Sequence, residues 1–441
     1  MNSRTWGGIE LLLSNLTVNQ EGHLLIGGVD TVELAKKYGT PAYIIDEERL
    51  RCNCQMFKEA VSKYYQGKGQ IYYASKALSC KEIIRIMKEE NLGIDVVSMG
   101  ELFTALSVDF PTDRICFHGN NKTLEEIQFA LKNKVGRIIV DNQEELHSIH
   151  QEAEALNIKP KIMLRIKPGV EAHTHAFIRT GQIDSKFGFA LETGEALKAA
   201  LEALQMKHVQ LTGFHCHIGS QIFEIQPFVL AAQLMIDFMK TVYEQTGVCL
   251  EELNLGGGFG IRYQQEDVPL DINHLMKSVS DAIEEKIKGT ALKFPFISLE
   301  PGRSIIGDVG ITLYTVGARK EIPGVRTYIT VDGGMTDNPR YALYHAAYDV
   351  VVAKRANEPK NECITLAGKC CESGDLIGED MPLQHAEKGD IIAVLCTGAY
   401  NYAMASHYNR IPNPPIVMVN NKKDRLIVKR ETLEDLLRND F

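Results

Sequence analysis

QIYYASKA occupies residues 70–77, and its β-branched and aromatic side chains predict a buried strand that ends near Lys76. Seven further runs of this kind occur along the chain, and segments with helical periodicity separate them. The expected helices include residues 81–90, 123–133, 144–156, 228–245 and 273–287. The expected strands are residues 70–77, 93–98, 114–119, 137–142, 161–168, 208–218, 251–256 and 296–300.

This alternation predicts a TIM-type (β/α)8 barrel. Eight strands with seven intervening helices occupy about 230 residues, and such a barrel typically needs roughly 250. A doubly wound open sheet is the alternative, but it usually carries fewer parallel strands. After residue 301 strands follow one another without comparable helices, at residues 312–318, 327–331, 362–366, 390–395 and 415–419. We expect a barrel domain over residues 44–300 and an all-β domain, a sandwich or barrel, formed by residues 1–43 and 301–441.

Composition excludes several classes of function. The 441 residues are 44% hydrophobic and 24% charged, with a formal net charge of -9 and no long basic run, so a nucleic-acid partner is not expected. No stretch approaches the roughly 20 apolar residues of a membrane span. The ten cysteines show no disulfide or zinc spacing, which favours reduced thiols in the cytoplasm and predicts no metal site.

Reactive residue types stand at the ends of four expected strands. Lys76 ends the first strand, His215 and His217 end the sixth, a run of three glycines ends the seventh, and Glu300 ends the eighth. The carboxyl ends of the strands in a parallel barrel meet at one face, and this face carries the active site. The four segments are therefore expected to converge on one site.

Each of these signals has an ordinary structural explanation as well. Lys76 is either a partly desolvated nucleophile or a lysine that extends to the barrel rim. Glycines 256–258 either let an anion approach the backbone N–H groups or form a tight turn. His217 is either a functional imidazole, with the Ser220 hydroxyl beyond it, or a structural histidine. Glu300 needs a cation, either Arg303 or a protonated pyridine. Taken together, these groups match what pyridoxal 5'-phosphate requires.

At these residues the sequence resembles the barrel-type pyridoxal-phosphate decarboxylases over nearly its whole length. A long loop with His173, Thr174 and His175, then Thr180-Gly181 and Ser185-Lys186-Phe187-Gly188, is similar to the members that act on diaminopimelate. The Cys371-Glu372 pair indicates the same group, since the ornithine type resembles Cys followed by Asp. The motifs that carry the resemblance are Tyr73-Ala74-Ser75-Lys76-Ala77, His215-Cys216-His217-Ile218-Gly219-Ser220-Gln221, Gly256-Gly257-Gly258, Glu300-Pro301-Gly302-Arg303 and Cys371-Glu372-Ser373-Gly374-Asp375.

The resemblance implies decarboxylation of meso-2,6-diaminopimelate to L-lysine and carbon dioxide, the last step of lysine biosynthesis. It also implies a homodimer with shared active sites, in which the β domain contributes to the substrate site and the dimer interface. Cys371 is the implied proton donor, although the adjacent Cys370 competes for this role. The implied cofactor-binding residues are Lys76, His217, Ser220, Gly256, Gly257, Gly258, Glu300, Gly302, Arg303 and Tyr400, and the implied substrate-binding residues are Arg303, Arg340, Tyr344, Glu372 and Tyr400.

Other functions remain open at this stage. A decarboxylase of the same fold could act on ornithine, arginine or carboxynorspermidine. An amino-acid racemase on the same barrel resembles a design with arginine at the pyridine nitrogen, so Glu300 argues against it. A non-catalytic pyridoxal-phosphate-binding homologue would be expected to lack Arg303, Arg340 and Glu372 or the β domain. The Arg340 side chain suits a second carboxylate, because its planar guanidinium binds in a bidentate manner, but an ordinary surface arginine fits the sequence equally well.

Overall fold

The computed structural model describes residues 13–170 and 185–441. The chain divides into two compact units. The barrel unit lies within Cys54–Gly260 and Pro269–Gly302, and the β unit contains the described residues up to Asn53, together with Ile261–Val268 and Arg303–Phe441. The barrel unit thus begins ten residues after the expected position 44 and excludes an internal segment, 261–268.

Eight parallel strands close into the expected barrel, which confirms the fold class. They pair in the order β9-β11-β12-β13-β5-β6-β7-β8, and β8 pairs with β9 to complete the ring. A two-residue strand, β10 (Phe189–Ala190), pairs with the end of β9. The barrel strands are β5 (Gly69–Ala74), β6 (Gly93–Val96), β7 (Ile115–Phe117), β8 (Arg137–Val140), β9 (Lys161–Lys167), β11 (Gln210–Cys216), β12 (Glu252–Asn254) and β13 (Phe296–Leu299).

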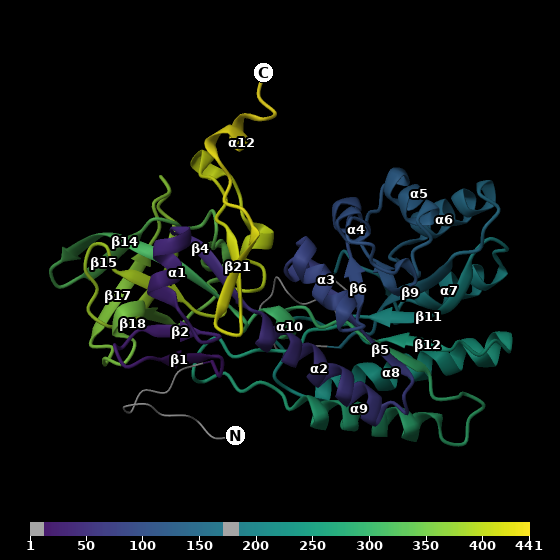
Figure 1. Cartoon of the computed structure of the whole chain (residues 1–441). Helices are drawn as coiled ribbons and strands as arrows, with labels where there is room; N and C mark the ends of the chain where they lie inside the picture. Colours follow the sequence, from purple (N-terminus) through teal and green to yellow (C-terminus); the bar gives the residue numbers. More distant parts are fainter. Residues whose placement is uncertain (1–12, 171–184) are drawn as a thin grey trace. The chain divides into compact units, whose positions relative to one another are not determined.

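Amphipathic helices connect the strands of the barrel. In α3 (Lys81–Glu89) the buried residues are Ile83, Ile84, Ile86 and Met87, which share one side of the helix. Helices α8 and α9 lie side by side (Figure 1). The seven helices of the barrel are α3 (Lys81–Glu89), α4 (Met99–Leu106), α5 (Leu124–Lys132), α6 (Gln143–Ala155), α7 (Glu195–Gln205), α8 (Gln226–Thr246) and α9 (Ile272–Ile287), and α2 (Glu47–Tyr64) precedes β5.

The β unit is built around a long strand, β14 (Gly310–Ile322). Its sheet runs β18-β17-β15-β14-β4-β20-β21, with β19 paired to β14 and to β16, so the N-terminal strand β4 (Ala42–Asp46) joins C-terminal strands. The other strands of this unit are β1 (Leu16–Val18), β2 (Leu24–Ile26), β3 (Val29–Asp30), β15 (Arg326–Val331), β16 (Val350–Val352), β17 (Glu362–Ala367), β18 (Leu376–Leu383), β19 (Ile391–Val394), β20 (Ile416–Asn420) and β21 (Lys423–Val428). Its helices include α1 (Thr31–Tyr38), α10 (Arg303–Ile306), α11 (Arg340–Tyr344) and α12 (Leu433–Leu437).

Two strand ends differ from the sequence-based expectation. Strand β5 ends at Ala74, and Lys76 lies in a 3-10 turn, Ser75–Ala77, that the sequence did not predict. The glycines 256–258 lie beyond β12, which ends at Asn254. Among the helices of the described residues, none combines the length and the apolar character that crossing a bilayer requires.

Candidate active site

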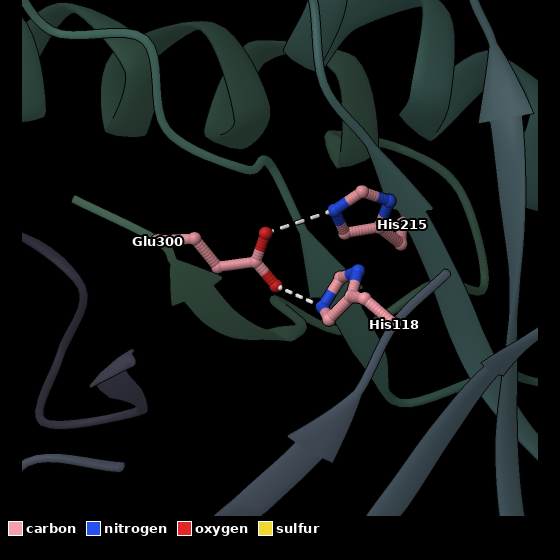
Figure 2. Close-up of side chains that lie close together, drawn as sticks. All are labelled: His118, His215 and Glu300. Atoms are coloured by element: carbon pink, nitrogen blue, oxygen red, sulfur yellow. Dashed lines mark hydrogen bonds and ion pairs between the residues drawn. The ribbon is translucent and has the colours of Figure 1, made fainter. Parts of the chain in front are cut away.

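A buried carboxylate lies at the carboxyl ends of the barrel strands. Glu300 directly follows β13, and its side chain meets two histidines from other strands, as Figure 2 shows. The Nε2 of His118, one residue beyond β7, lies 2.8 Å from Oε1, and the Nε2 of His215 in β11 lies 3.0 Å from Oε2. Asn254, the last residue of β12, donates from Nδ2 to Oε1 at 2.6 Å. Four strands therefore supply one network.

This network keeps Glu300 ionised. Burial alone would raise the pKa of the carboxyl, but His118 and His215 oppose this and hold the pKa well below its ordinary value. Burial lowers the pKa of His215 to about 4, so this imidazole is neutral and donates to Glu300 through Nε2. Glu300 is therefore a buried anion that accepts hydrogen bonds from His215 and Asn254.

Other charged side chains surround this anion. Asp95 in β6 is buried, and burial raises its pKa, although the charges of His118 and Lys76 oppose the rise. Arg165 in β9 lies 3.5 Å from Asp141 and stacks on the ring of Phe187 at 4.2 Å. Phe187 belongs to the expected Ser185–Gly188 motif, whereas the motif residues 173–175 and 180–181 lie outside the described residues. The barrel mouth therefore contains charges of both signs.

The three glycines are required by crowding of backbone from neighbouring strand ends. A Cβ on Gly256 would lie 2.5 Å from the carbonyl oxygen of Cys216, and one on Gly257 would lie 2.2 Å from that of Glu300. A Cβ on Gly258 would lie 2.5 Å from the Gly219 oxygen. Gly256 and Gly258 also have positive φ, of 68° and 106°. A side chain is thus excluded at all three positions, which brings this turn against the ends of β11 and β13.

The hydrogen bonds of this turn decide which of its N–H groups remain for a ligand. Gly256 donates to Asn254 Oδ1 at 2.9 Å, and Gly257 donates to His217 Nδ1 at 3.2 Å. Within the described chain, Gly258 is the one glycine of the three whose N–H has no protein acceptor. The half-buried His217 accepts at Nδ1, and burial, then the charge of Lys76, lower its pKa well below the ordinary value. His217 is therefore neutral and protonated on Nε2.

Lys76 is an exposed residue in the turn that follows β5. The 3-10 turn that carries it is held by Ser75, whose hydroxyl donates to Glu101 at 2.9 Å. The charge of Lys76 contributes to lowering the pKa of Asp95, Glu101 and His217. The lysine thus belongs electrostatically to the same strand-end cluster as Asp95 and His217.

In the β unit, two arginines pack among tyrosine rings. Arg340 is buried and donates to the Tyr348 hydroxyl at 2.7 Å, and its guanidinium lies 4.9 Å from the centre of the Tyr263 ring. Arg303 donates to the Tyr263 hydroxyl at 2.7 Å and lies 4.8 Å from the Tyr400 ring centre. Among the described residues, Arg340 has no carboxylate in ion-pair distance.

The remaining expected substrate residues occupy more open positions. Tyr344 is half-buried in α11. Cys371 and Glu372 are exposed, and the backbone N–H of Cys371 donates to Asn409 Oδ1 at 2.7 Å. Burial, followed by Asp375, raises the pKa of the neighbouring Cys370 to about 11, which makes its thiolate scarce at neutral pH. The structure therefore distinguishes the two thiols by their surroundings.

His118, His215 and Glu300 are also the described residues whose spacing is closest to that of a metal site. Their candidate ligand atoms lie within 4.8 Å of one another. Metal ligands, however, point at a common centre about 2 Å away. Here both Nε2 atoms approach the carboxylate oxygens themselves, and the amide of Asn254 donates to the same group. The geometry favours a hydrogen-bonded anion.

The sequence did not single out several members of these clusters. His118, Asp95 and Arg165 belong to none of the five motifs, and Tyr263 and Tyr348 were not expected beside Arg340. A usable signal was present for the barrel residues, because each is a polar residue within or directly after an apolar strand run. The tyrosines had no such signal, since packing alone brings them to the arginines.

Comparison with known proteins indicates the chemistry. Residues 48–307 match the family model described as pyridoxal-dependent decarboxylase, pyridoxal binding domain. The chain is 48% identical to the diaminopimelate decarboxylase of Bacillus subtilis over 96% of each chain, and 49% identical to that of Bacillus methanolicus over 94% of this chain and 96% of the relative. It is similar to the crystal structure of diaminopimelate decarboxylase from M. jannaschii in complex with L-lysine, with a TM-score of 0.91, 35% identity and 98% coverage of both chains.

Proposed function

Since the chain belongs to the diaminopimelate decarboxylase family of pyridoxal-dependent enzymes, we propose that it converts meso-2,6-diaminopimelate to L-lysine and carbon dioxide. The observation that carries this proposal is the buried, ionised carboxylate of Glu300 beside a turn of three glycines at the barrel strand ends. These features suit a cofactor with a ring nitrogen at one end and a phosphate at the other.

The residues present fit pyridoxal 5'-phosphate. Glu300 would pair with the protonated ring nitrogen, and the neutral His217 would stack on the ring. The Gly258 N–H and the Ser220 hydroxyl are suited to the phosphate, because Gly256 and Gly257 donate within the protein. Lys76 would carry the cofactor through its amine, with Gly302, Arg303 and Tyr400 as further contacts. When bound, pyridoxal 5'-phosphate supplies an electron sink for the pair of electrons that departing carbon dioxide leaves behind.

The protein residues bind the substrate, orient it and move protons. Arg340 is proposed to bind the carboxylate at the far end of the substrate, with Arg303 and Tyr344, because a buried guanidinium that has no carboxylate partner within residues 13–170 and 185–441 is suited to an anion. Glu372 is proposed to bind the distal ammonium. Cys371 is proposed to deliver the proton to the carbon that has lost carbon dioxide, in preference to Cys370, whose raised pKa reflects its burial.

We further propose that the protein acts as a homodimer with shared active sites in the cytoplasm. The exposed turn with Cys371 and Glu372 supports the shared site, because both side chains are accessible to a second copy. None of the ten cysteines, all of which the structure describes, forms a disulfide, and this agrees with a reducing compartment.

The decisive experiment incubates pyridoxal-phosphate-loaded protein with meso-diaminopimelate and measures lysine and carbon dioxide. Stoichiometric formation of both is expected for the wild type, and ornithine, arginine and carboxynorspermidine are expected to react far more slowly. Preferential release of carbon dioxide from one of these three would replace the substrate assignment, and release from none would indicate a non-catalytic binding protein.

A Lys76→Ala protein provides the control. It is expected to lack both the visible absorbance of bound cofactor and the activity, because no other group replaces the amine. If both properties persist, Lys76 does not carry the cofactor.

A further inference from the structure

Glu300 has three protein partners, and their placement differs. Asn254 donates to Oε1 and is itself held by the Gly256 N–H at its Oδ1. His215 serves the other oxygen, Oε2. The Nε2 of His118 lies 2.8 Å from Oε1. His118 directly follows β7, which β5 and β6 separate from β13 in the barrel. It is thus the partner that ties Glu300 to the opposite part of the barrel.

The position of His118 is rigid. Its backbone N–H donates to the carbonyl of Val96 at 2.8 Å, which extends the pairing of β6 with β7 by one residue. The residue is 5% exposed, and its ring packs edge-on against that of His215, with 4.9 Å between ring centres and 72° between planes. A side chain held by both its backbone and its ring has little freedom to leave the carboxylate.

We propose that His118 is a positioning residue for the decarboxylation, which holds Glu300 in the orientation and the charged state that the cofactor's ring nitrogen needs. This inference rests on the proposed function and adds a residue that none of the sequence motifs contains. Without His118 the carboxylate keeps two donors, but its burial is no longer balanced, so it takes up a proton at a higher pH.

Other charged groups around Glu300 also affect the pKa of its carboxyl. Arg165 favours the ionised form of the carboxylate, whereas Asp95 opposes it, and both stay in place when His118 is changed. Within residues 13–170 and 185–441, the titratable and charged groups that interact electrostatically with Glu300 are Asp95, Cys116, His118, Arg165, His215, Cys216 and His217.

Three variants test the proposal. His118→Phe keeps the ring volume and removes the nitrogen, whereas His118→Gln keeps an N–H donor. His150→Phe is the matched control, because His150 lies half-buried on α6 of the same unit and packs on His208 rather than near Glu300. The measurements are the affinity for pyridoxal 5'-phosphate, the absorbance of bound cofactor above about 400 nm against pH, and kcat and KM against pH.

His118→Phe is expected to lower kcat about 10- to 100-fold with a smaller change in KM, the scale of removing an outer partner of an active-site group. The acid limb of both kcat and the absorbance moves to higher pH by about one unit or more, since turnover and colour require ionised Glu300. His118→Gln restores the limb towards its wild-type position, and His150→Phe leaves it in place.

A loss of kcat without movement of either acid limb would overturn the proposal, because a merely structural defect has that pattern. A stoichiometric divalent metal ion in the wild type that is absent from His118→Phe would also overturn it. If His118→Phe does not fold, His118→Gln decides: an acid limb close to that of the wild type is expected, and an acid limb that moves to higher pH by about one unit or more contradicts the proposal. The absorbance titration needs no substrate, so it remains a test even if diaminopimelate is not converted.

Discussion

The barrel unit and the β unit each bury a charge, and they treat it in opposite ways. Glu300 in the barrel has hydrogen bonds from Asn254 and His215 and lies 2.8 Å from His118 Nε2, so the protein itself surrounds the anion with partners. Arg340 in the β unit has a phenol hydroxyl and two tyrosine rings but, among the described residues, no carboxylate. A buried charge is costly without a counter-charge. The difference agrees with the proposed roles, in which Glu300 pairs with the bound cofactor and Arg340 binds an anionic group of the substrate.

The largest test of this comparison is Glu300→Gln. The amide is neutral, and its NH2 group would face donors, so turnover is expected to fall about 10²- to 10³-fold, the scale of losing one directed electrostatic group. Steady-state kcat with diaminopimelate measures this effect. Glu251→Gln is the control, because Glu251 is exposed just before β12. Near-normal turnover in Glu300→Gln would show that turnover does not need the ionised carboxylate of Glu300.

Arg340→Ala tests the other half of the comparison. If the guanidinium of Arg340 binds the distal carboxylate of the substrate, the variant is expected to have a KM for diaminopimelate about 10- to 100-fold higher than the wild type. This is in line with a charge-assisted hydrogen bond of roughly 1.5–3 kcal/mol. Kinetics with diaminopimelate and with lysine-like monoacids measure the preference. Arg319→Ala, which removes a cation paired with Glu362, is the control. An unchanged preference in Arg340→Ala would refute the assignment.

Gly257→Ala tests how tightly the glycine turn is pressed against the Glu300 backbone. The added Cβ would lie 2.2 Å from the Glu300 carbonyl oxygen, so a loss of about 1–3 kcal/mol in the free energy of unfolding is expected. Denaturant unfolding measures the loss. Gly100→Ala, an exposed helical position whose nearest atom would be 3.8 Å away, should not be destabilising. Equal stability of both variants would show that the turn relaxes easily.

The smallest effect on turnover is expected for Asp337→Asn, which extends the comparison to a second buried carboxyl. Burial raises the pKa of Asp337 to about 7, despite the hydrogen bonds from Tyr314 and Gly334 that lower it. The folded state therefore keeps a proton that the unfolded state releases, so stability is full below pH ~4 and falls as pH rises towards 7. Melting temperatures of the wild type should decline over this window relative to those of Asp337→Asn. Parallel pH profiles would mean that Asp337 is ionised like Glu300.

Much of the barrel was predictable because its signals are local. Each strand is a short apolar run, and a parallel barrel places all strand ends on one face, so Glu300, His217 and the glycines could be grouped before any coordinates. Strand ends were less accurate. The hydroxyl of Ser75 donates to Glu101 in α4, a contact that is non-local in sequence, and Lys76 lies in the 3-10 turn beyond the strand end at Ala74.

The β unit was less predictable because its order is non-local. Strand β4 pairs with β14 and β20, strands from distant parts of the sequence, and periodicity contains no information on such pairing. Tyr263 belongs to Ile261–Val268, a segment of the β unit that lies between the two barrel segments in sequence. For the same reason, its position beside Arg340 could not be predicted.

The amino-acid sequence by itself determined the barrel, the family and the chemical groups at the strand ends, because residue type and short-range periodicity encode these features. Only the tertiary structure decided that His118 and His215 share the carboxylate of Glu300 and, for the part of the chain that the structure describes, that the Gly258 N–H has no acceptor and that Arg340 is buried without a carboxylate. The physical reason is that burial and hydrogen-bond geometry depend on groups far apart in the chain, and folding alone brings those groups within 3 Å of one another.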